Sequence, residues 1–269
     1  MPRFDSLMNV SLPSIANQTR PPERIVLVTD RVALTESEQS GITTAVSPIP
    51  VTFLINERCQ GAAGSWNTGL AYINECHSKC YVAILDDDDY WLTNHLELCL
   101  THSQRGAASL VLSGISVIKE GHAVASNIPN NLKQSDFLVG NPGWQGSNTF
   151  AQCQLLIDAG GFSDGLVSSN DKDLAIRVLT ITNIKIEYTL AVTVCWNLGM
   201  HSTALSARGS RQKLLGCAQF ILLHGHRMTR PQKEQYFERI SSLFAISEQA
   251  IVNEMNTNKD IRIAAGSLS

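Results

Sequence analysis

The sequence lacks the stretches that would place the chain across a membrane or on a nucleic acid. No apolar run reaches the length of about 20 residues that a membrane-spanning helix needs. Residues 1–20 also lack the apolar core of a signal peptide. No run of lysine and arginine forms a basic patch, and the net charge is −3 at pH 7. We therefore expect no transmembrane span and no nucleic-acid partner, and we leave a peripheral membrane contact open.

Cysteine is present without the pattern of a disulfide framework or a structural zinc site. The seven cysteines are odd in number and scattered, which favours reduced thiols and a cytoplasmic location. Cys76 and Cys80 lie four residues apart, but no second pair of ligands follows at the spacing of a zinc site. We also find no internal repeat and no low-complexity segment.

Length and composition favour one large α/β domain, or one such domain with an appendage. The chain has 269 residues, of which 43% are hydrophobic and 17% are charged, so it can form a sizeable core. Apolar runs typical of buried strands occupy residues 24–29, 51–55, 81–85, 108–119 and 184–196. Helical patterns follow near 210–224, 231–243 and 245–256. We expect an α/β domain over residues 1–205 and a helical appendage over 206–269 that packs on this domain or on a second subunit.

The chain is organised around residues 82–91, where an apolar run ends in four carboxylates, Asp86, Asp87, Asp88 and Asp89. Ligands of open α/β sheets bind beyond the carboxyl ends of the strands. Adjacent carboxylates repel one another, so the cluster is costly unless a cation neutralises it. A divalent ion held by one or two carboxylates and by substrate phosphates fits this position. The alternative is a solvated acidic turn.

A second motif consists of small residues, Gly61-Ala62-Ala63-Gly64, at the expected start of a helix. Small residues allow the backbone to approach a ligand, and a helix N-terminus favours an anion such as phosphate. No complete phosphate-loop pattern is present, so a plain glycine-rich turn is the alternative.

Several stretches in this order resemble the inverting glycosyltransferases of family 2, which have the GT-A fold, a Rossmann-like three-layer α/β sandwich. The resemblance covers residues 7–205. It rests on residues 10–19, 24–30, 61–70, 85–91, 146–148, 160–162 and 169–177. The Asp-x-Asp motif alone is weakly specific, but its combination with Gly-Gly-Phe at 160–162 and the later Asp171 is strong.

The resemblance implies a role for each matching residue on the donor side. Asp30 would accept a hydrogen bond from the nucleotide base, and Asp86 would lie near the ribose. Asn67 and Asp87 would also contact the donor. Asp88 would bind the divalent ion, Mg²⁺ or Mn²⁺, that bridges the donor diphosphate.

On the acceptor side, the resemblance makes Asp171 the general base, with Asn170 beside it. Trp144 would stack on an acceptor sugar, with a packed loop tryptophan as the alternative. His201 would be a metal ligand or a phosphate contact, and a surface or core histidine is equally compatible with its position.

The implied reaction moves a sugar from a nucleotide-diphosphate-sugar to a hydroxyl of a saccharide or lipid-linked saccharide, as in polysaccharide biosynthesis. One displacement with one base inverts the anomeric configuration. The metal would stabilise the charge on the leaving phosphate, and a carboxylate would take the proton of the attacking hydroxyl.

Three features depart from the family pattern. Only residues 1–4 precede the first expected helix, so either the chain starts further upstream or the sheet lacks an inner strand. Trp66 stands where the family often has arginine. Asn170 replaces a glutamate, so Asp171 should ionise more readily because it loses a like-charged neighbour.

Two other functions remain compatible with the motifs. A degenerate GT-A module would bind a nucleotide-sugar without turnover. A haloacid-dehalogenase-like phosphatase also has Asp-x-Asp behind a buried strand, but it needs Thr or Val two residues after the second Asp, where this chain has Tyr90.

Overall fold

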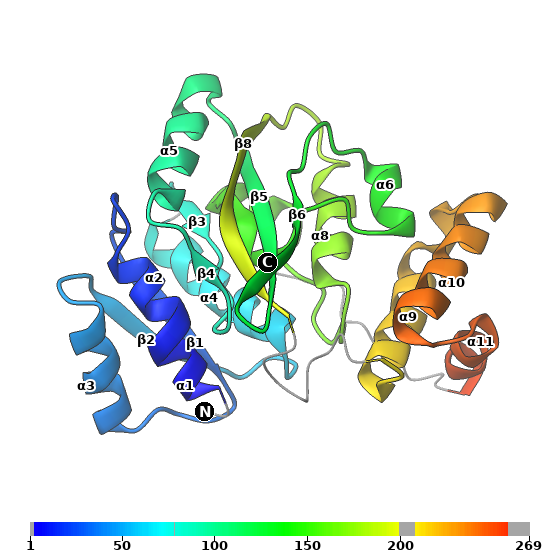
Figure 1. Ribbon diagram of the computed structural model, residues 1–269, viewed down its shortest axis with the longest axis horizontal. Helices are drawn as coiled ribbons and strands as arrows, with labels where there is room; N and C mark the ends of the chain where they lie inside the picture. The colour runs from blue at the N-terminus through cyan, green and yellow to red at the C-terminus, as the bar shows by residue number, and fades with distance from the viewer. Residues whose placement is uncertain (1–2, 78, 199–207, 258–269) are drawn as a thin grey trace.

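The computed structural model describes residues 3–77, 79–198 and 208–257. Figure 1 shows a central sheet with helices around it, so the predicted α/β class is confirmed. The N-terminal helices and a small sheet lie at one end, and the C-terminal helices lie at the other.

The chain begins with three short helical segments that follow one another without a break. They are α1 (Phe4–Ser6), the π-helical η1 (Leu7–Ser11) and α2 (Leu12–Ala16). Pro13 is the second residue of α2, and Ser11 and Leu12 before it keep right-handed helical backbone angles, so the helix continues into Pro13 without a new start.

A parallel pair of strands follows, β1 (Ile25–Asp30) and β2 (Val51–Asn56). The connection contains α3 (Glu36–Ala45), in a segment predicted only as a loop or weak helix. Thr35 and Glu38 form a capping box at its start, which satisfies two N–H groups that the helix leaves free. The next helix, α4 (Ala62–His77), packs on β1, where Gly69 lies against Val28.

The main sheet is mixed and has the order β3-β7-β5-β8-β4, with β6 on β5. Its strands are β3 (Tyr81–Ala83), β4 (Tyr90–Trp91), β5 (Leu110–Lys119), β6 (His122–Asn127), β7 (Thr149–Gln152) and β8 (Ile186–Asn197). β5 and β8 are parallel, and the other pairs are antiparallel. The sequence pattern missed β4 and β7, which are too short to show alternation.

No described strand joins the small sheet to the main one by hydrogen bonds. Instead, Ile25 and Leu27 of β1 share a hydrophobic cluster with Val111 and Ile115 of β5. Side-chain packing rather than a shared ladder therefore holds the two sheets together.

The remaining helices cover the sheet and the C-terminal end. They are α5 (His95–Gly106), α6 (Gln134–Val139), the 3-10 turn η2 (Gly146–Asn148), α7 (Cys153–Asp158), α8 (Asn170–Val178), α9 (Arg211–His224), η3 (Gly225–Arg227), α10 (Arg230–Phe244) and α11 (Glu248–Thr257). Among the described residues, none of these helices combines the length and apolarity needed to cross a bilayer.

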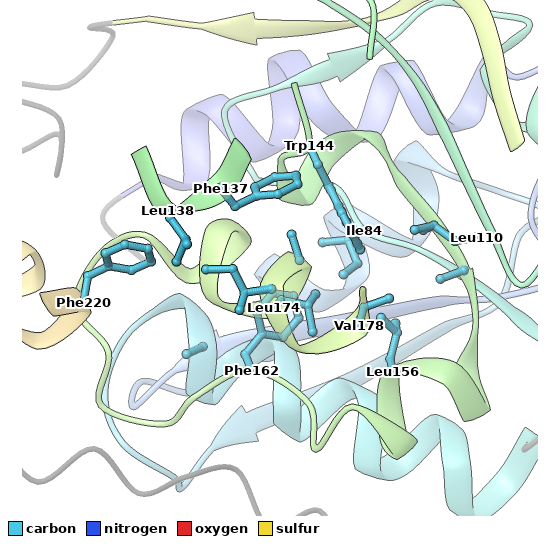
Figure 2. Packing of buried hydrophobic residues seen from close by; sticks show 14 of the residues in the cluster. Ile84, Leu110, Phe137, Leu138, Trp144, Leu156, Phe162, Leu174, Val178 and Phe220 are labelled. Atoms are coloured by element: carbon cyan, nitrogen blue, oxygen red, sulfur yellow. The ribbon is translucent and has the colours of Figure 1, made fainter. Parts of the chain in front are cut away.

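The C-terminal helices belong to the main hydrophobic core. Figure 2 shows Phe220 of α9 beside Leu138 of α6, in the cluster that also holds Leu174 of α8. Tyr236 and Ile251, from α10 and α11, belong to the same cluster. The predicted packing of this region on the α/β domain is therefore observed, and a domain boundary near residue 205, outside the described residues, stays a proposal.

Two helical glycines provide a matched test of this packing. A Cβ on Gly216 of α9 would lie 2.1 Å from Ser168 Oγ and 2.8 Å from the Ser168 backbone N, whereas one on Gly41 of α3 would meet nothing within 4 Å. We expect Gly216→Ala to lower the free energy of unfolding by about 1–3 kcal/mol, because the helix must move away from the Ser168 loop. Gly41→Ala should raise it by about 0.5–1 kcal/mol through helix propensity. Urea denaturation measures both, and equal effects would contradict this account of α9 packing.

Candidate active site

The four carboxylates lie between the end of β3 and the start of β4, and each has its own environment. Asp89 is only 2% exposed. It accepts hydrogen bonds from Ser147 Oγ at 2.6 Å and from the Asn197 N–H at 3.0 Å. Burial raises the pKa of Asp89 to about 7. Asp89 therefore anchors the acidic turn to η2 and β8, a role that the sequence pattern did not reveal.

Asp86 is a carboxylate of the acidic turn that interacts electrostatically with Asp171, the predicted base. Its backbone N–H donates to Ser147 Oγ at 3.2 Å. Burial, followed by the charges of Asp89, Asp88 and Asp171, raises the pKa of Asp86 well above its usual range. Two residues predicted from separate motifs, Asp86 and Asp171, are thus brought together in the fold.

Asp87 and Asp88 both pair with one cation, the guanidinium of Arg3. Arg3 Nη2 lies 3.0 Å from Asp87 Oδ1, and Nη1 lies 2.6 Å from Asp88 Oδ2. The guanidinium shows that this pair of carboxylates can hold a positive charge. Among the described residues, no group of three or more His, Cys, Asp or Glu side chains forms a metal site. A divalent ion bound by Asp88 therefore stays a prediction. His201 lies outside the described residues.

Asp30 joins the end of β1 to the turn before α4. Its Oδ1 accepts from Asn56 Nδ2 at 2.8 Å, and its Oδ2 accepts from the Gly61 N–H at 3.0 Å. Gly61 has a φ of +117°, which favours glycine, and a Cβ on Gly64 would lie 2.0 Å from the Cys59 carbonyl oxygen. The glycines of this motif are therefore explained by the turn itself, and a nucleotide-base contact of Asp30 stays a prediction.

Asn67 is fully buried, and both polar atoms of its side-chain amide form hydrogen bonds within the protein. Its Nδ2 donates to the Phe162 carbonyl at 2.8 Å and to Asp164 Oδ1 at 3.1 Å, and its Oδ1 accepts from the Phe162 N–H at 2.8 Å. These bonds fasten α4 to the Gly-Gly-Phe loop. The predicted donor contact is corrected to a supporting role, because no polar atom of this amide is left for a ligand.

Trp144 is a core residue, so the prediction that it stacks on an acceptor sugar is wrong. The side chain is 1% exposed, and Nε1 donates to Thr149 Oγ1 at 2.8 Å. Figure 2 shows its ring among apolar side chains, with Phe137 in an edge contact at 6.2 Å between centroids. The turn residues of the Asn-Pro-Gly-Trp loop are typical of an exposed loop, so the sequence did not reveal that the ring of Trp144 is buried.

Trp66 is the aromatic side chain that lies beside Asp171. Its ring centroid is 4.5 Å from that of Phe162. A Cβ on Gly146 would lie 3.2 Å from the Trp66 ring and 3.7 Å from Asp171 Oδ1, so both side chains lie close to Gly146. The sequence showed Trp66 only as a departure from the family pattern.

Asp171 is the second residue of α8 and is half-buried. Burial raises its pKa to about 6, although backbone N–H groups of Gly146 and Asp171 and the charge of Lys213 oppose the rise. Desolvation thus sets the direction of the shift, and the effect of Asn170 in place of a glutamate stays a prediction. Its Oδ1 has no hydrogen-bond partner among the described residues.

The side chains before Asp171 form no hydrogen-bonded cap on α8. Ser169, at the N-cap, is left-handed with a φ of 71° and makes no capping hydrogen bond through its side chain. Ser168 and Asn170 are only 5% and 7% exposed. Their Oγ and Oδ1 atoms have no partner among the described residues. Such buried unpaired atoms are uncommon and often mark a site, so the predicted acceptor contact of Asn170 stays open as a proposal.

Asp173, two residues further, belongs to a buried network on another face of α8. It accepts from Ser163 Oγ at 2.8 Å and Arg177 Nη2 at 2.7 Å, and it bonds His224 Nε2 at 2.8 Å. Burial alone would raise the pKa of Asp173, but these partners hold it below its ordinary value. Asp173 thus ties α8 to α9 and to the loop at Ser163, and sequence reasoning gave it no structural role.

Comparison with known families matches the N-terminal half of this architecture. A family model described as glycosyl transferase family 2 matches residues 7–154. A curated Escherichia coli relative, UDP-Glc:alpha-D-GlcNAc-diphosphoundecaprenol beta-1,3-glucosyltransferase WfgD, is 28% identical over 134 residues, which are half of this chain and half of that protein. The chain thus matches about half the length of this relative.

Comparison with solved structures extends the similarity to most of the chain. The S. aureus TarS fragment 1–349 in complex with UDP-GlcNAc has a TM-score of 0.62 and 14% identity, over 92% of this chain and 71% of that one. The Pyrobaculum calidifontis mannosyltransferase PcManGT in complex with GDP-Man and Mn²⁺ has a TM-score of 0.51 and 16% identity, over 94% and 71%. The predicted GT-A fold class is confirmed.

The buried network of Asp173 predicts a large loss of stability on substitution. Asp173→Asn should lower the free energy of unfolding by about 3–5 kcal/mol, because Arg177 and His224 lose a buried partner. The matched control is Asp158→Asn, in an exposed carboxylate of α7, which should change it by less than about 0.5 kcal/mol. Chemical denaturation at pH 7 measures both, and similar small effects would contradict the role of the network.

The same substitution has a defined pH dependence. Because the folded-state pKa of Asp173 is lowered, its contribution is complete above the unfolded value of about 3.9 and is lost as the pH falls toward the folded value. The stability difference between wild type and Asp173→Asn should therefore shrink below about pH 4. A constant difference from pH 7 to pH 3 would argue against an ionised Asp173.

Proposed function

Because the chain belongs to glycosyl transferase family 2, we propose that it transfers a sugar from a nucleotide-diphosphate-sugar to a hydroxyl of a saccharide or lipid-linked saccharide, with inversion. The relatives support this class of reaction. The E. coli relative is named for UDP-Glc and a diphosphoundecaprenol-linked acceptor, and the structural neighbours hold UDP-GlcNAc or GDP-Man. We place this activity in residues 1–205, with 206–269 as the appendage.

The observation that carries the proposal is the meeting of Asp171 with the acidic turn. Asp171 acts as the general base, and its pKa of about 6 suits a base that works near neutral pH. Its Oδ1 is free to accept a proton, and Trp66 offers an apolar wall beside it. The charge of Asp171 also raises the pKa of Asp86, so the proposed base interacts electrostatically with the acidic turn.

In this mechanism, the acceptor hydroxyl lies within hydrogen-bond reach of Asp171. As the hydroxyl oxygen attacks the anomeric carbon, its proton passes to the Asp171 carboxylate and the bond to the nucleoside diphosphate breaks. The single attack inverts the anomeric configuration. Asp86 would lie near the ribose, while Asp30 and Asn67 hold the donor side of the fold in place.

Asp87 and Asp88 would hold a divalent cation, Mg²⁺ or Mn²⁺. When bound, the cation would stabilise the negative charge that develops on the leaving diphosphate. The support is the pair of carboxylates already neutralised by Arg3, together with the Mn²⁺ of the Pyrobaculum neighbour. Arg3 would have to leave these carboxylates for the cation to bind.

The base assignment predicts a selective loss of turnover. Asp171→Asn should lower kcat by about 10²–10⁴-fold, because it removes the proton acceptor and keeps the shape. Its thermal stability should equal or exceed that of wild type, because a carboxyl with a raised folded-state pKa destabilises the fold when it ionises. Product release from UDP-glucose, UDP-GlcNAc and GDP-mannose with an alkyl glycoside acceptor gives kcat, and Asp158→Asn is the control.

The wild-type pH profile provides an independent check. The kcat should fall as the pH drops through about 6, since Asp171 must be ionised to accept the proton. A flat profile, or an Asp171→Asn variant that loses donor binding as much as turnover, would contradict the assignment. Tight donor binding by wild type without turnover would support the degenerate module instead.

The cation assignment predicts a loss of metal-dependent donor binding. Asp88→Asn should abolish the increase in nucleotide-sugar affinity that Mn²⁺ produces, because one of two carboxylates at the site loses its charge. Calorimetric titration of the same three donors, with Mn²⁺ and with EDTA, measures this increase. Asp158→Asn should retain it in full. An unchanged Mn²⁺ effect in Asp88→Asn would disprove the metal role of Asp88.

A further inference from the structure

Two free thiols lie opposite each other where strand β3 begins and strand β7 ends. The antiparallel register pairs Tyr81 with Gln152. One residue further along the pair, Cys80 therefore lies opposite Cys153, and both cysteines are free. The Cys153 N–H donates to the Cys80 carbonyl oxygen at 2.9 Å. This bond continues the ladder, so the backbone fixes the two cysteines relative to each other.

The spacing of the two backbones suits a disulfide bond. Opposite residues that share backbone hydrogen bonds in an antiparallel pair have Cα atoms about 5.5 Å apart. Disulfides join residues whose Cα atoms are about 4.4–6.8 Å apart, and they are most frequent near this separation. A bond between Cys80 and Cys153 therefore needs no change in the register of β3 on β7.

The two side chains also lie on the same face of the sheet, as opposite residues of an antiparallel pair do. Cys153 is 0% exposed and belongs to the main hydrophobic cluster. Cys80 is half-buried and packs against that cluster. The two thiols form a hydrogen bond with each other. Their sulfur atoms are therefore neighbours, and solvent reaches the Cys80 side of the pair.

The hydrogen bond between the thiols makes them unequal in reactivity. It lowers the pKa of Cys80, whereas it raises the pKa of Cys153 together with burial. The thiolate is the form of cysteine that reacts with oxidants. Cys80 therefore reacts first with a soluble oxidant, and Cys153 is placed to react with the product.

Other cysteines define the competing products. Cys99 and Cys195 are buried, and burial raises the pKa of both thiols, so little of their reactive form is present. Cys59 and Cys76 are exposed and accessible to an oxidant. Cys76 lies four residues before Cys80 in the sequence, so a short-range disulfide between these two is the main alternative product.

We propose that Cys80 and Cys153 form an oxidisable pair, which hydrogen peroxide converts into a disulfide between β3 and β7. The Cys80 thiolate attacks one peroxide oxygen, the O–O bond breaks, hydroxide leaves, and Cys80 becomes a sulfenic acid. The Cys153 sulfur then attacks the Cys80 sulfur and the S–O bond breaks. The departing hydroxyl takes the Cys153 proton and leaves as water. The two thiols lose two electrons in total, and the peroxide gains them.

The disulfide would fasten the two strands that support the acidic turn. β3 leads to Asp86, and β7 follows η2, where Ser147 Oγ lies 3.2 Å from the Asp86 backbone N and donates to Asp89 at 2.6 Å. The cross-link would also enclose residues 81–152, and closing a long loop restricts the unfolded chain. Oxidation should therefore stabilise the fold. The pair is independent of the proposed transfer reaction, because it needs neither donor nor acceptor.

The first test maps the product of oxidation in the whole chain. Reduced protein is treated with hydrogen peroxide at pH 7, free thiols are alkylated, and a non-reducing digest is analysed by mass spectrometry. Trypsin and Asp-N together cut between Cys80 and Cys76 and between Cys80 and Cys99. We expect a Cys80–Cys153 disulfide as the main linked product, in wild type and in the exposed-site control Cys59→Ser. A Cys76–Cys80 disulfide as the main product, or no disulfide, would overturn the proposal.

The second test identifies which thiol reacts first, with dimedone as a trap for sulfenic acid. Cys153→Ala removes the second thiol, so dimedone should label Cys80 about tenfold more than in wild type. Cys80→Ser should leave Cys153 unlabelled, because that thiol is buried. Equal labelling of Cys80 in wild type and in Cys153→Ala, or labelling of Cys153 in Cys80→Ser, would overturn the proposal. The first test needs no variant at Cys153, so it decides the proposal even if Cys153→Ala does not fold.

The third test measures the effect of the cross-link on stability. The urea midpoint of unfolding should be about 1 M higher for oxidised than for reduced wild type, which is the shift expected from a disulfide of ordinary strength. Cys80→Ser should lose this difference, and Cys59→Ser should keep it. An equal or lower midpoint in the oxidised protein would show that the bond strains the two strands, contrary to the proposal.

Discussion

Mutual repulsion among four consecutive carboxylates is the constraint on which the arrangement of the site depends. The fold reduces this repulsion by giving each carboxylate a different environment. Asp89 turns inward to Ser147 and Asn197, while Asp87 and Asp88 share the guanidinium of Arg3. Burial and the neighbouring carboxylates raise the pKa of Asp86 well above its usual range, which favours its neutral form. Pairing of some carboxylates and a raised pKa for others therefore reduce the repulsion within the acidic turn.

Asp171 lies between two charged groups of opposite sign. Burial dominates its pKa, and Lys213 acts against it, while Asp171 itself raises the pKa of Asp86. A base in this position can keep a pKa near the working pH, because neither neighbour fixes it fully in one state.

The sequence predicted those features that depend on local patterns. The longer strands, the helices α9 to α11 and the C-terminal packing follow from apolar periodicity, and the meeting of the acidic turn with Asp171 follows from the family resemblance. The two-residue β4 and the four-residue β7 were not predicted, because neither is long enough to show the alternation of apolar and polar residues that marks a strand. The sequence also could not predict which individual side chains are buried, and for this reason Trp144 was assigned to the site and Trp66 was not.

The same limit applies to polar residues. Asn67 and Asp173 lie in motifs that suggest ligand contact, yet both are saturated by bonds to distant parts of the chain, Phe162 and His224. Such pairings need the tertiary fold and leave no local signal. The small sheet illustrates the consequence, because it has no hydrogen-bonded ladder to the main sheet among the described strands. Helix α4 adds polar links to the apolar contacts between β1 and β5, since Asp30 bonds the Gly61 N–H just before its start and Asn67 bonds the Phe162 N–H from its middle. These buried polar residues therefore resemble site residues in the sequence although their hydrogen bonds hold parts of the fold together.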